Sequence, residues 1–185
     1  MQINSKIHFI GISGIGMSGI AELMLDKGYS IQGSDISVND NTKRLKKKGI
    51  KFFLGHNKKN IKYAHAVVYS SAIKKNNPEI KEAYIKKIPV LSRADMLSEL
   101  MKNKKSIAIA GSHGKTTTTS LVGNIFNEAG LDPTIVNGGI INSFSNNNRY
   151  GKGEWMIVEA DESDGTFLKL PHQISIITNL DIEHM

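Results

Sequence analysis

The most constraining feature of the sequence is the stretch Ile107–Thr119, IAIAGSHGKTTTT, in which an apolar strand leads through a loop ending in Gly-Lys-Thr into a helix. In such loops backbone N–H groups surround phosphate oxygens, a lysine reaches the β- and γ-phosphates, and a threonine hydroxyl ligates Mg²⁺. The usual motif reads Gly-x-x-x-x-Gly-Lys-Ser/Thr. The place of its first glycine is taken here by Ile109, inside the strand. The sequence therefore predicts a shortened phosphate-binding loop, formed by Gly111, Ser112, His113, Gly114, Lys115, Thr116 and Thr117.

A second glycine-rich turn follows the apolar strand Lys6–Ile10 and opens a helix. It contains the spacing Gly14-x-Gly16-x-x-Gly19, which lets backbone approach a pyrophosphate closely at a helix N-terminus. Asp35 ends the next strand, where a carboxylate can accept a hydrogen bond from a ribose hydroxyl. The pattern predicts a dinucleotide- or nucleotide-diphosphate site, and on this motif alone a nicotinamide cofactor is an open alternative.

Strands and helices alternate along the whole chain, which indicates parallel α/β sheets. We expect strands at Lys6–Ile10, Tyr29–Asp35, Ala64–Ala72 and Ser106–Gly111, with helices between them. The polar run Lys102–Lys105 marks a domain boundary. The predicted fold class is a Rossmann-like parallel-sheet domain at residues 1–101, followed at residues 106–185 by the start of a P-loop-type α/β domain. Because the second part is too short to cover both faces of such a sheet, we expect the chain to be the N-terminal part of a longer protein.

Polar residues follow the later strands. The segment Val158–Asp164, VEADESD, offers Glu159, Asp161 and Glu162 as oxygen ligands, one of which could hold the Mg²⁺ of ATP. His184 lies past the end of the last predicted strand and is a candidate ligand only in that context. The segment Val136–Ile140, VNGGI, is by itself typical of an ordinary turn.

Composition narrows the class of protein. Cysteine is absent from the 185 residues, which excludes disulfides and thiolate metal sites and fits a cytoplasmic protein. No apolar run spans a bilayer, and the first residues lack a signal-peptide pattern, so we expect no membrane insertion. The net charge is +7. Its densest basic run, Thr42–Lys62, holds no recognisable nucleic-acid motif, so we expect a solvated lysine-rich surface and anionic substrates rather than nucleic-acid binding.

Taken in order, these motifs resemble those of the Mur ligases of peptidoglycan synthesis. The resemblance covers essentially the whole chain and rests on IHFIGISGIGMSGIAELM, GSDI, VVYSSAI, GSHGKTTTT, NGG, VEADESDGTF and ITNLDIEHM. The ATP loop of this family is the short one, typically Gly-Thr-x-Gly-Lys-Thr, and Ser112 stands here in the place of its threonine. His113 and the run of threonines favour the member that adds L-alanine.

The resemblance implies three domains, of which the last, which closes over the site and helps bind the amino acid, is absent from this sequence. It implies that ATP phosphorylates the lactyl carboxylate of UDP-N-acetylmuramate and that L-alanine attacks the acyl phosphate. Lys115 would stabilise the transferring phosphoryl group, Thr116 and Glu159 would hold one Mg²⁺, and His184 would help hold a second. The substrate-binding residues would then be Gly11, Ser13, Gly14, Ile15, Gly16, Met17, Ser18, Asp35, Ser70, Ser71 and, across the domain cleft, Asn137.

Four alternatives remain at this point. A nicotinamide-dependent oxidoreductase explains Gly14 to Asp35 but not Gly-Lys-Thr. A family member that reattaches recycled peptides to the sugar nucleotide shares the motifs. A binding module without catalysis fits a chain that lacks the last domain, and a basic nucleic-acid-binding protein fits only the net charge. The sequence leaves amino-acid selectivity and oligomeric state open.

Overall fold

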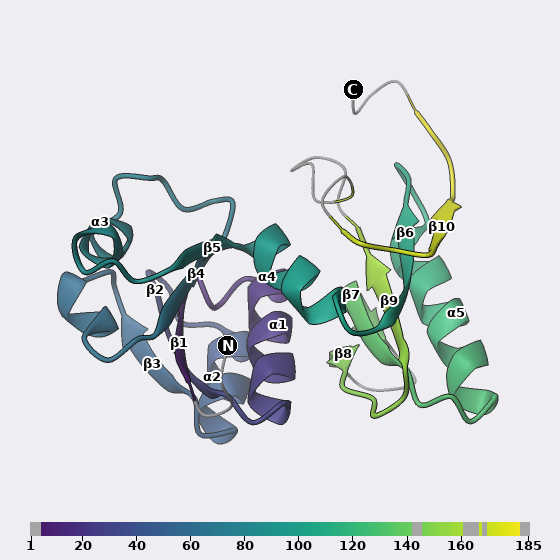
Figure 1. Cartoon of the computed structure of the whole chain (residues 1–185), viewed down its shortest axis with the longest axis horizontal. Helices are drawn as coiled ribbons and strands as arrows, with labels where there is room; N and C mark the ends of the chain where they lie inside the picture. The colour runs from purple at the N-terminus through teal and green to yellow at the C-terminus, as the bar shows by residue number, and fades with distance from the viewer. Residues whose placement is uncertain (1–4, 142–145, 161–166, 168–169, 182–185) are drawn as a thin grey trace. The chain divides into compact units, whose positions relative to one another are not determined.

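The structure is a computed structural model that describes residues 5–141, 146–160, 167 and 170–181. The chain divides into two compact units, Met1–Met96 and Leu97–Met185 (Figure 1). The helix α4 (Arg93–Met101) runs across this division.

The first unit is built on a five-stranded parallel sheet in the order β3-β2-β1-β4-β5. From β1 the chain moves outward on one side to β2 and β3, then returns to the other side of β1 for β4 and β5. The carboxyl ends of β1 and β4 therefore flank the point where the strand order reverses, which is where open α/β sheets bind ligands. The strands are Lys6–Ile10 (β1), Ser30–Asp35 (β2), Lys51–Leu54 (β3), Ala66–Tyr69 (β4) and Val90–Ser92 (β5).

Helices cover both faces of this sheet. The helices α1 (Ile15–Asp26) and α2 (Asp40–Lys47) lie on one face, and the 3₁₀ helix η1 (Lys58–Ile61) and α3 (Pro78–Ile85) lie on the other (Figure 1). Asn77 caps α3: its side chain accepts a hydrogen bond from the N–H of Glu79.

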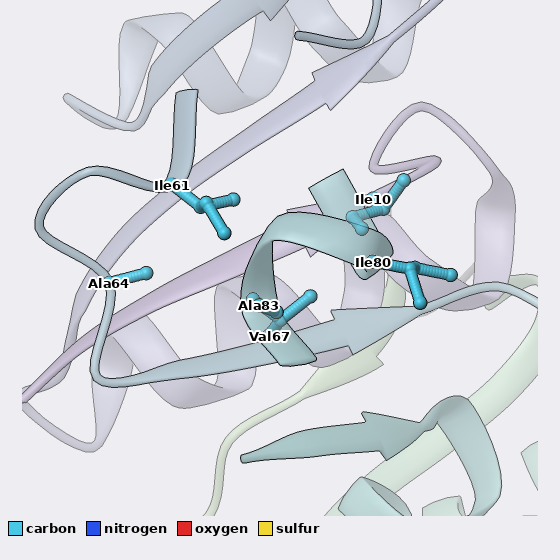
Figure 2. Close-up of a cluster of buried hydrophobic side chains, with 6 residues drawn as sticks. All are labelled: Ile10, Ile61, Ala64, Val67, Ile80 and Ala83. Atoms are coloured by element: carbon cyan, nitrogen blue, oxygen red, sulfur yellow. The ribbon is translucent and has the colours of Figure 1, made fainter. Parts of the chain in front are cut away.

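Side chains of β1 alternate between the two faces, because successive residues of a strand point to opposite sides. Ile10 packs with Val67 of β4 and with Ile80 and Ala83 of α3 (Figure 2). Ile61 and Ala64 complete this buried cluster. Burial of each isoleucine contributes about 1.5–3 kcal/mol, so the cluster fixes α3 and η1 on the sheet.

The second unit has a five-stranded sheet in the order β10-β6-β9-β7-β8, in which β8 alone runs antiparallel to its neighbour. Helix α5 (Lys115–Glu128) packs against β6, β7 and β9, and its Phe126 meets Trp155 edge to face at 5.2 Å between ring centroids. The strands are Lys105–Ala110 (β6), Thr134–Ile141 (β7), Asn146–Arg149 (β8), Trp155–Glu159 (β9) and Ile174–Ile177 (β10).

The predicted α/β class, a Rossmann-like parallel sheet followed by a second α/β unit, is confirmed, with β8 making the second sheet mixed. One local prediction is wrong: the segment Val136–Ile140 is not a turn but lies within β7. Its β-branched start pairs with β9, and the register with β8 shifts between Val136 and Ile141. The turn-forming residues therefore produce an irregular strand rather than a chain reversal.

Within the described part of the chain, none of the helices has the length and hydrophobicity that crossing a membrane requires.

Candidate functional site

The predicted phosphate-binding loop joins β6 to α5 in the second unit. Ile109 is fully buried within β6, as predicted, so the loop comprises only Gly111 to Gly114. Gly111 and Gly114 have φ angles of +130° and +80°, a region that glycine adopts without steric cost. The shortened loop is thus closed by glycines at both of its ends.

Lys115 is the first residue of α5, and its ammonium group donates hydrogen bonds to the carbonyl oxygens of Gly111 and Ser112. The charge therefore sits over the loop rather than away from it. Gly114 caps the helix, and no side chain described in the structure makes a capping hydrogen bond there. The first N–H groups of α5 and its positive dipole end are consequently oriented toward the loop, as in anion-binding helix termini.

Thr116 and Glu159 are brought together at this edge of the sheet. Glu159 is the last residue of β9 and lies opposite Ile109 in the parallel ladder. Its Oε2 accepts a hydrogen bond from Thr116 Oγ1 at 3.0 Å. Adjacent oxygen ligands of an octahedral Mg²⁺ with metal–oxygen bonds of about 2.0–2.1 Å lie roughly 3 Å apart. The pair therefore fits two neighbouring positions of a magnesium ion.

The described residues contain no cluster of three or more His, Asp or Glu side chains suited to a metal. Mg²⁺ commonly takes a few protein oxygens and completes its shell with water and substrate phosphates. His184, Asp161 and Glu162, the other candidate ligands, lie outside the described residues.

Asn137 lies behind Thr116 and is only 2% exposed. Its Nδ2 donates to the carbonyl oxygen of Thr116 at 3.2 Å and to Ser120 Oγ at 2.9 Å. Its backbone N–H donates to Asn148 Oδ1 on β8. In this structure Asn137 therefore connects β7 to the first turns of α5, and its predicted contact with substrate stays a prediction.

On the outer side of the loop, His113 and Thr117 are exposed. His113 Nε2 lies 3.5 Å from Asp181 Oδ2, and both side chains are largely in solvent. Sequence reasoning missed Asp181 and its neighbours Thr178 and Asn179, which hydrogen-bond to the loop. The available signal was the polar segment that directly follows the apolar strand β10.

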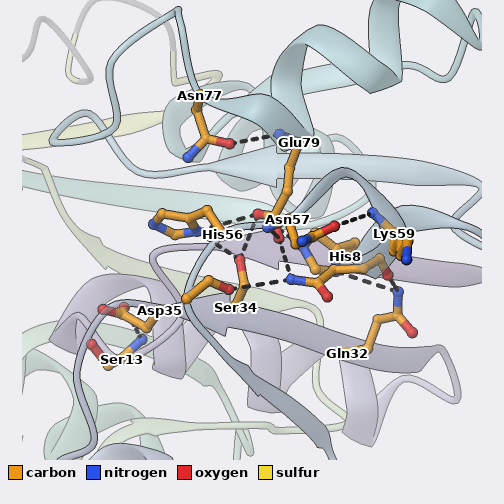
Figure 3. Close-up of polar contacts among 12 residues, drawn as sticks. His8, Ser13, Gln32, Ser34, Asp35, His56, Asn57, Lys59, Asn77 and Glu79 are labelled. Carbon is orange, nitrogen blue, oxygen red and sulfur yellow. Dashed lines mark hydrogen bonds and ion pairs between the residues drawn. The ribbon is translucent and has the colours of Figure 1, made fainter.

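In the first unit, the glycine turn is held by the end of β2. Ser34 O accepts hydrogen bonds from the N–H groups of Gly11 (2.9 Å) and Ile12 (3.2 Å). Asp35 Oδ2 accepts a third, from the N–H of Ser13 at 2.9 Å (Figure 3). The turn thus has a fixed backbone at the carboxyl edge of the sheet.

The turn also meets the end of β4. Gly11 has a φ of +79°, and a Cβ there would lie 3.2 Å from Cβ of Ser70. Ser70 itself is half-buried and donates its N–H to Ile10 O, whereas Ser71 is exposed. The structure therefore brings Gly11, Ser13 and Ser70 together at the point where the strand order reverses.

The remaining predicted residues of the turn divide into two groups. Gly14 caps α1 without a side-chain capping bond in the described structure, and Ile15 is 50% exposed. Gly16 follows them and faces the guanidinium of Arg93. The side chains of Met17 and Ser18 are buried, and the Ser18 hydroxyl bonds to Ile15 O at 3.0 Å. Gly14 and Ile15 are thus exposed, whereas Met17 and Ser18 are buried, and contact of any of these residues with substrate stays a prediction.

Asp35 is 8% exposed, and its second oxygen accepts the N–H of Ser37 at 3.3 Å. The carboxylate is therefore already engaged in holding the turn. This observation weakens the nicotinamide reading, in which the carboxylate at the end of the second strand binds a ribose.

A buried polar network lies beneath the end of β2 and was not predicted from sequence (Figure 3). At its centre Glu79 Oε2 accepts a hydrogen bond from Ser34 Oγ at 2.6 Å and lies 3.4 Å from His8 Nε2 and 3.3 Å from His56 Nδ1. Oε1 accepts from Asn60 Nδ2 at 2.7 Å. Burial by itself would raise the pKa of Glu79, but the adjacent His8 imidazole and the donors Ser34 and Asn60 outweigh it and lower the pKa.

The chain is similar to known proteins in sequence and in structure. The family described as "Mur ligase family, catalytic domain" matches residues 6–105. The UDP-N-acetylmuramate–L-alanine ligase of Azorhizobium caulinodans is 59% identical over 180 residues, which are 97% of this chain and 38% of that protein. The chain thus spans about 38% of the length of this relative.

Solved structures of ligases are also similar to this chain. A UDP-N-acetylmuramate–alanine ligase from Thermotoga maritima matches with a TM-score of 0.90 and 35% identity over 97% of this chain and 42% of its own. A murein peptide ligase from Psychrobacter arcticus matches with a TM-score of 0.87 and 25% identity over 97% of this chain and 44% of its own.

Proposed function

The chain belongs to the Mur ligase family, and from this premise we propose that it takes part in the ATP-dependent ligation of L-alanine to UDP-N-acetylmuramate. The observation that carries the proposal is the Thr116–Glu159 pair beside a phosphate-binding loop, in a chain that is much more similar in sequence to alanine-adding ligases than to the peptide ligase. The reaction would belong to peptidoglycan precursor synthesis and would form an amide through an acyl phosphate.

In the first step a carboxylate attacks the γ-phosphorus of ATP, which brings two anions together. Catalysis must therefore neutralise charge and hold the reacting atoms in line. Lys115 would exchange its bonds to the carbonyl oxygens of Gly111 and Ser112 for bonds to the transferring phosphoryl group. The first N–H groups of α5 would bind the oxygens of the same phosphates.

Thr116 Oγ1 and Glu159 would hold a magnesium ion, and His184 would contribute to a second. Bound there, Mg²⁺ would supply positive charge between the phosphate oxygens. Asn137 would keep Thr116 in place through its bond to the threonine carbonyl. Gly111, Ser112, His113, Gly114 and Thr117 would surround the triphosphate.

The first unit would bind the UDP end of the substrate. The backbone from Gly11 to Ile15, which ends at the first residue of α1, would contact the diphosphate. Ser70 and Ser71 would contact the sugar nucleotide from the end of β4, and Asp35 would act by fixing the turn. We assign residues 1–101 to this substrate domain and residues 106–185 to the beginning of the ATP domain.

A second candidate is a ligase that attaches a recycled peptide to the same sugar nucleotide, which the structural similarity to the Psychrobacter arcticus protein favours. The two candidates share the ATP chemistry and differ in the amine that attacks the acyl phosphate. Sequence identity favours L-alanine.

The test uses the protein expressed from its complete coding sequence, supplied with ATP, Mg²⁺ and UDP-N-acetylmuramate. ADP release that requires L-alanine would support the proposal. Release that requires a murein peptide instead would establish the second candidate. Calorimetric titration with NADH and with UDP-N-acetylmuramate provides the control for the first unit, and binding of NADH alone would reject both ligase readings.

A further inference from the structure

We propose that the segment Thr178–Asp181, which follows β10, positions the phosphate-binding loop, and that Asn179 is its central residue. The inference rests on the proposed function of that loop and adds to it residues that do not touch the nucleotide. It is carried by a set of hydrogen bonds between two parts of the second unit that are far apart in sequence.

Asn179 binds two consecutive N–H groups of the loop. Its Oδ1 accepts from the N–H of His113 at 2.9 Å, and its backbone carbonyl oxygen accepts from the N–H of Ser112 at 3.3 Å. Asn179 therefore holds the middle of the loop through both its side chain and its backbone.

The neighbours of Asn179 add bonds on either side. Thr178 Oγ1 donates to His113 O at 2.6 Å and to Ala110 O at 3.2 Å. The N–H of Asp181 donates to Ser112 Oγ at 3.0 Å. The segment thus contacts every residue from the end of β6 to His113.

At Gly111 the backbone of the loop packs closely against the segment Thr178–Asp181. A Cβ at Gly111 would lie 2.2 Å from Thr178 Oγ1 and 2.9 Å from Asn179 O. Both distances are too short for any side chain to be accommodated without movement. The first loop glycine is therefore required by the β10 segment as well as by its own φ angle.

These contacts explain how a shortened loop can stay ordered. The N–H groups of Ser112 and His113 are bonded to Asn179, and the first N–H groups of α5 are directed toward the loop. The shortened loop is held here by hydrogen bonds from the segment Thr178–Asp181, which lies outside the loop. A loop that is ordered before ATP binds spares the binding step the cost of ordering it.

The segment is suited to a test because it lies at the surface. Asn179 is exposed, so its replacement creates no cavity in the core. The Asn179→Ala variant keeps the chain and the loop residues but loses the Oδ1 acceptor. For one lost hydrogen bond that orders the loop, we expect the Kd for Mg-ATP to rise roughly three- to tenfold.

Thr178 offers a matched pair of variants. Thr178→Ser keeps the hydroxyl that bonds to His113 O, whereas Thr178→Val removes it while keeping a branched side chain of the same size. We expect Thr178→Val to weaken Mg-ATP binding by a similar factor and Thr178→Ser to bind as the parent does. The Kd for UDP-N-acetylmuramate, which depends on the first unit, should change in none of the three.

The measurement is a titration of each protein, expressed from its complete coding sequence, with a fluorescent ATP analogue, alongside its thermal midpoint. Unchanged ATP affinity in Asn179→Ala, or equal loss in Thr178→Ser and Thr178→Val, would overturn the inference. A lowered midpoint with unchanged affinity would assign the segment to stability alone and overturn it as well. If the parent itself binds no ATP, the proposed function fails first, and this inference fails with it.

Discussion

Thr116 Oγ1 and Glu159 Oε2 are 3.0 Å apart although 43 residues separate them in sequence. The parallel pairing of β6 with β9 produces this contact, because it puts Ile109 opposite Glu159 and so brings the start of α5 to the end of β9. A hydroxyl and a carboxylate at this separation would supply two neighbouring oxygen ligands of the proposed magnesium site. The position is set by the sheet, not by a flexible loop.

Replacing Glu159 should therefore change how the ligation rate depends on the Mg²⁺ concentration. Glu159→Gln keeps the size of the side chain but removes the negative charge that attracts the cation. We expect the Mg²⁺ concentration for half-maximal ligation to rise by at least about tenfold, with a lower maximal rate. Thr116→Ser, which keeps the hydroxyl, is the matched control and should titrate as the parent does. An unchanged Mg²⁺ titration in Glu159→Gln would count against the assigned role.

Lys115 should be required for chemistry but not for substrate binding in the first unit. Lys115→Ala removes the ammonium that bonds to the loop carbonyls, and we expect ligation to fall roughly 10²–10³-fold, as when one preorganised donor to a transition state is lost. The Kd for UDP-N-acetylmuramate should stay the same by calorimetry. Lys105→Ala, which removes an exposed lysine paired with Glu154, controls for the change in net charge. Near-normal turnover in Lys115→Ala would reject the phosphate-loop assignment.

The parts of the fold that depend on neighbouring residues could be predicted from sequence. The strand Lys6–Ile10 matches its predicted bounds, and a helix follows the Gly-Lys-Thr motif as predicted. Gly28 follows Lys27, the C-cap of α1, with a φ of +90°, as is common for a glycine just past the end of a helix. In each case the physical cause of the local structure lies in a few consecutive residues.

The parts that depend on distant partners could not be predicted. Asn137 lies in a strand because β7 pairs with β9 and β8, and no local pattern contains that pairing. The contact of Asn179 with His113 requires β10 to lie beside β6. His8 interrupts an apolar strand, which was the visible sign of a buried polar network, but its partner Glu79 comes from α3.

Two glycines of the first turn should respond differently to alanine. Gly11 has a φ of +79° and would press a Cβ against Ser70, so we expect Gly11→Ala to lower the free energy of unfolding by about 1–2 kcal/mol. Gly14 has a φ of −61°, and its added Cβ would meet only Gly11 O at an ordinary 3.6 Å. Gly14→Ala should therefore change stability by less than about 0.5 kcal/mol.

Ligand binding separates the two variants further. If the backbone at Gly14 approaches a diphosphate, the added methyl group in Gly14→Ala should weaken UDP-N-acetylmuramate binding while the protein stays folded. Chemical denaturation and calorimetry on the same samples measure both quantities. Loss of stability in Gly14→Ala, or unchanged affinity in a folded Gly14→Ala, would contradict a diphosphate contact at the start of α1.

The network around Glu79 predicts a specific dependence of stability on pH. The pKa of Glu79 is lower in the folded protein than its ordinary value. At pH values between the folded and the ordinary pKa, the unfolded chain therefore binds more protons than the folded protein. The stabilisation by Glu79 is therefore complete above the ordinary pKa of about 4.3 and is lost as the pH falls through the lowered folded value. His8 from β1 and His56 after β3 are the titratable side chains that face this carboxylate, at 3.4 Å and 3.3 Å from its Oε2.

We expect Glu79→Gln to be less stable than the parent at pH 7 by about 1–3 kcal/mol, since a buried charged acceptor is lost. Its free energy of unfolding should also fall less steeply between pH 5 and pH 3, a window chosen at roughly one unit either side of the ordinary glutamate pKa. The two proteins differ only at residue 79, so the difference between their slopes reports Glu79. Urea denaturation followed by circular dichroism at each pH measures it. Glu82→Gln, on the same helix and paired at the surface with Lys86, should keep the slope of the parent, and equal slopes in all three proteins would show that Glu79 does not carry the acid sensitivity.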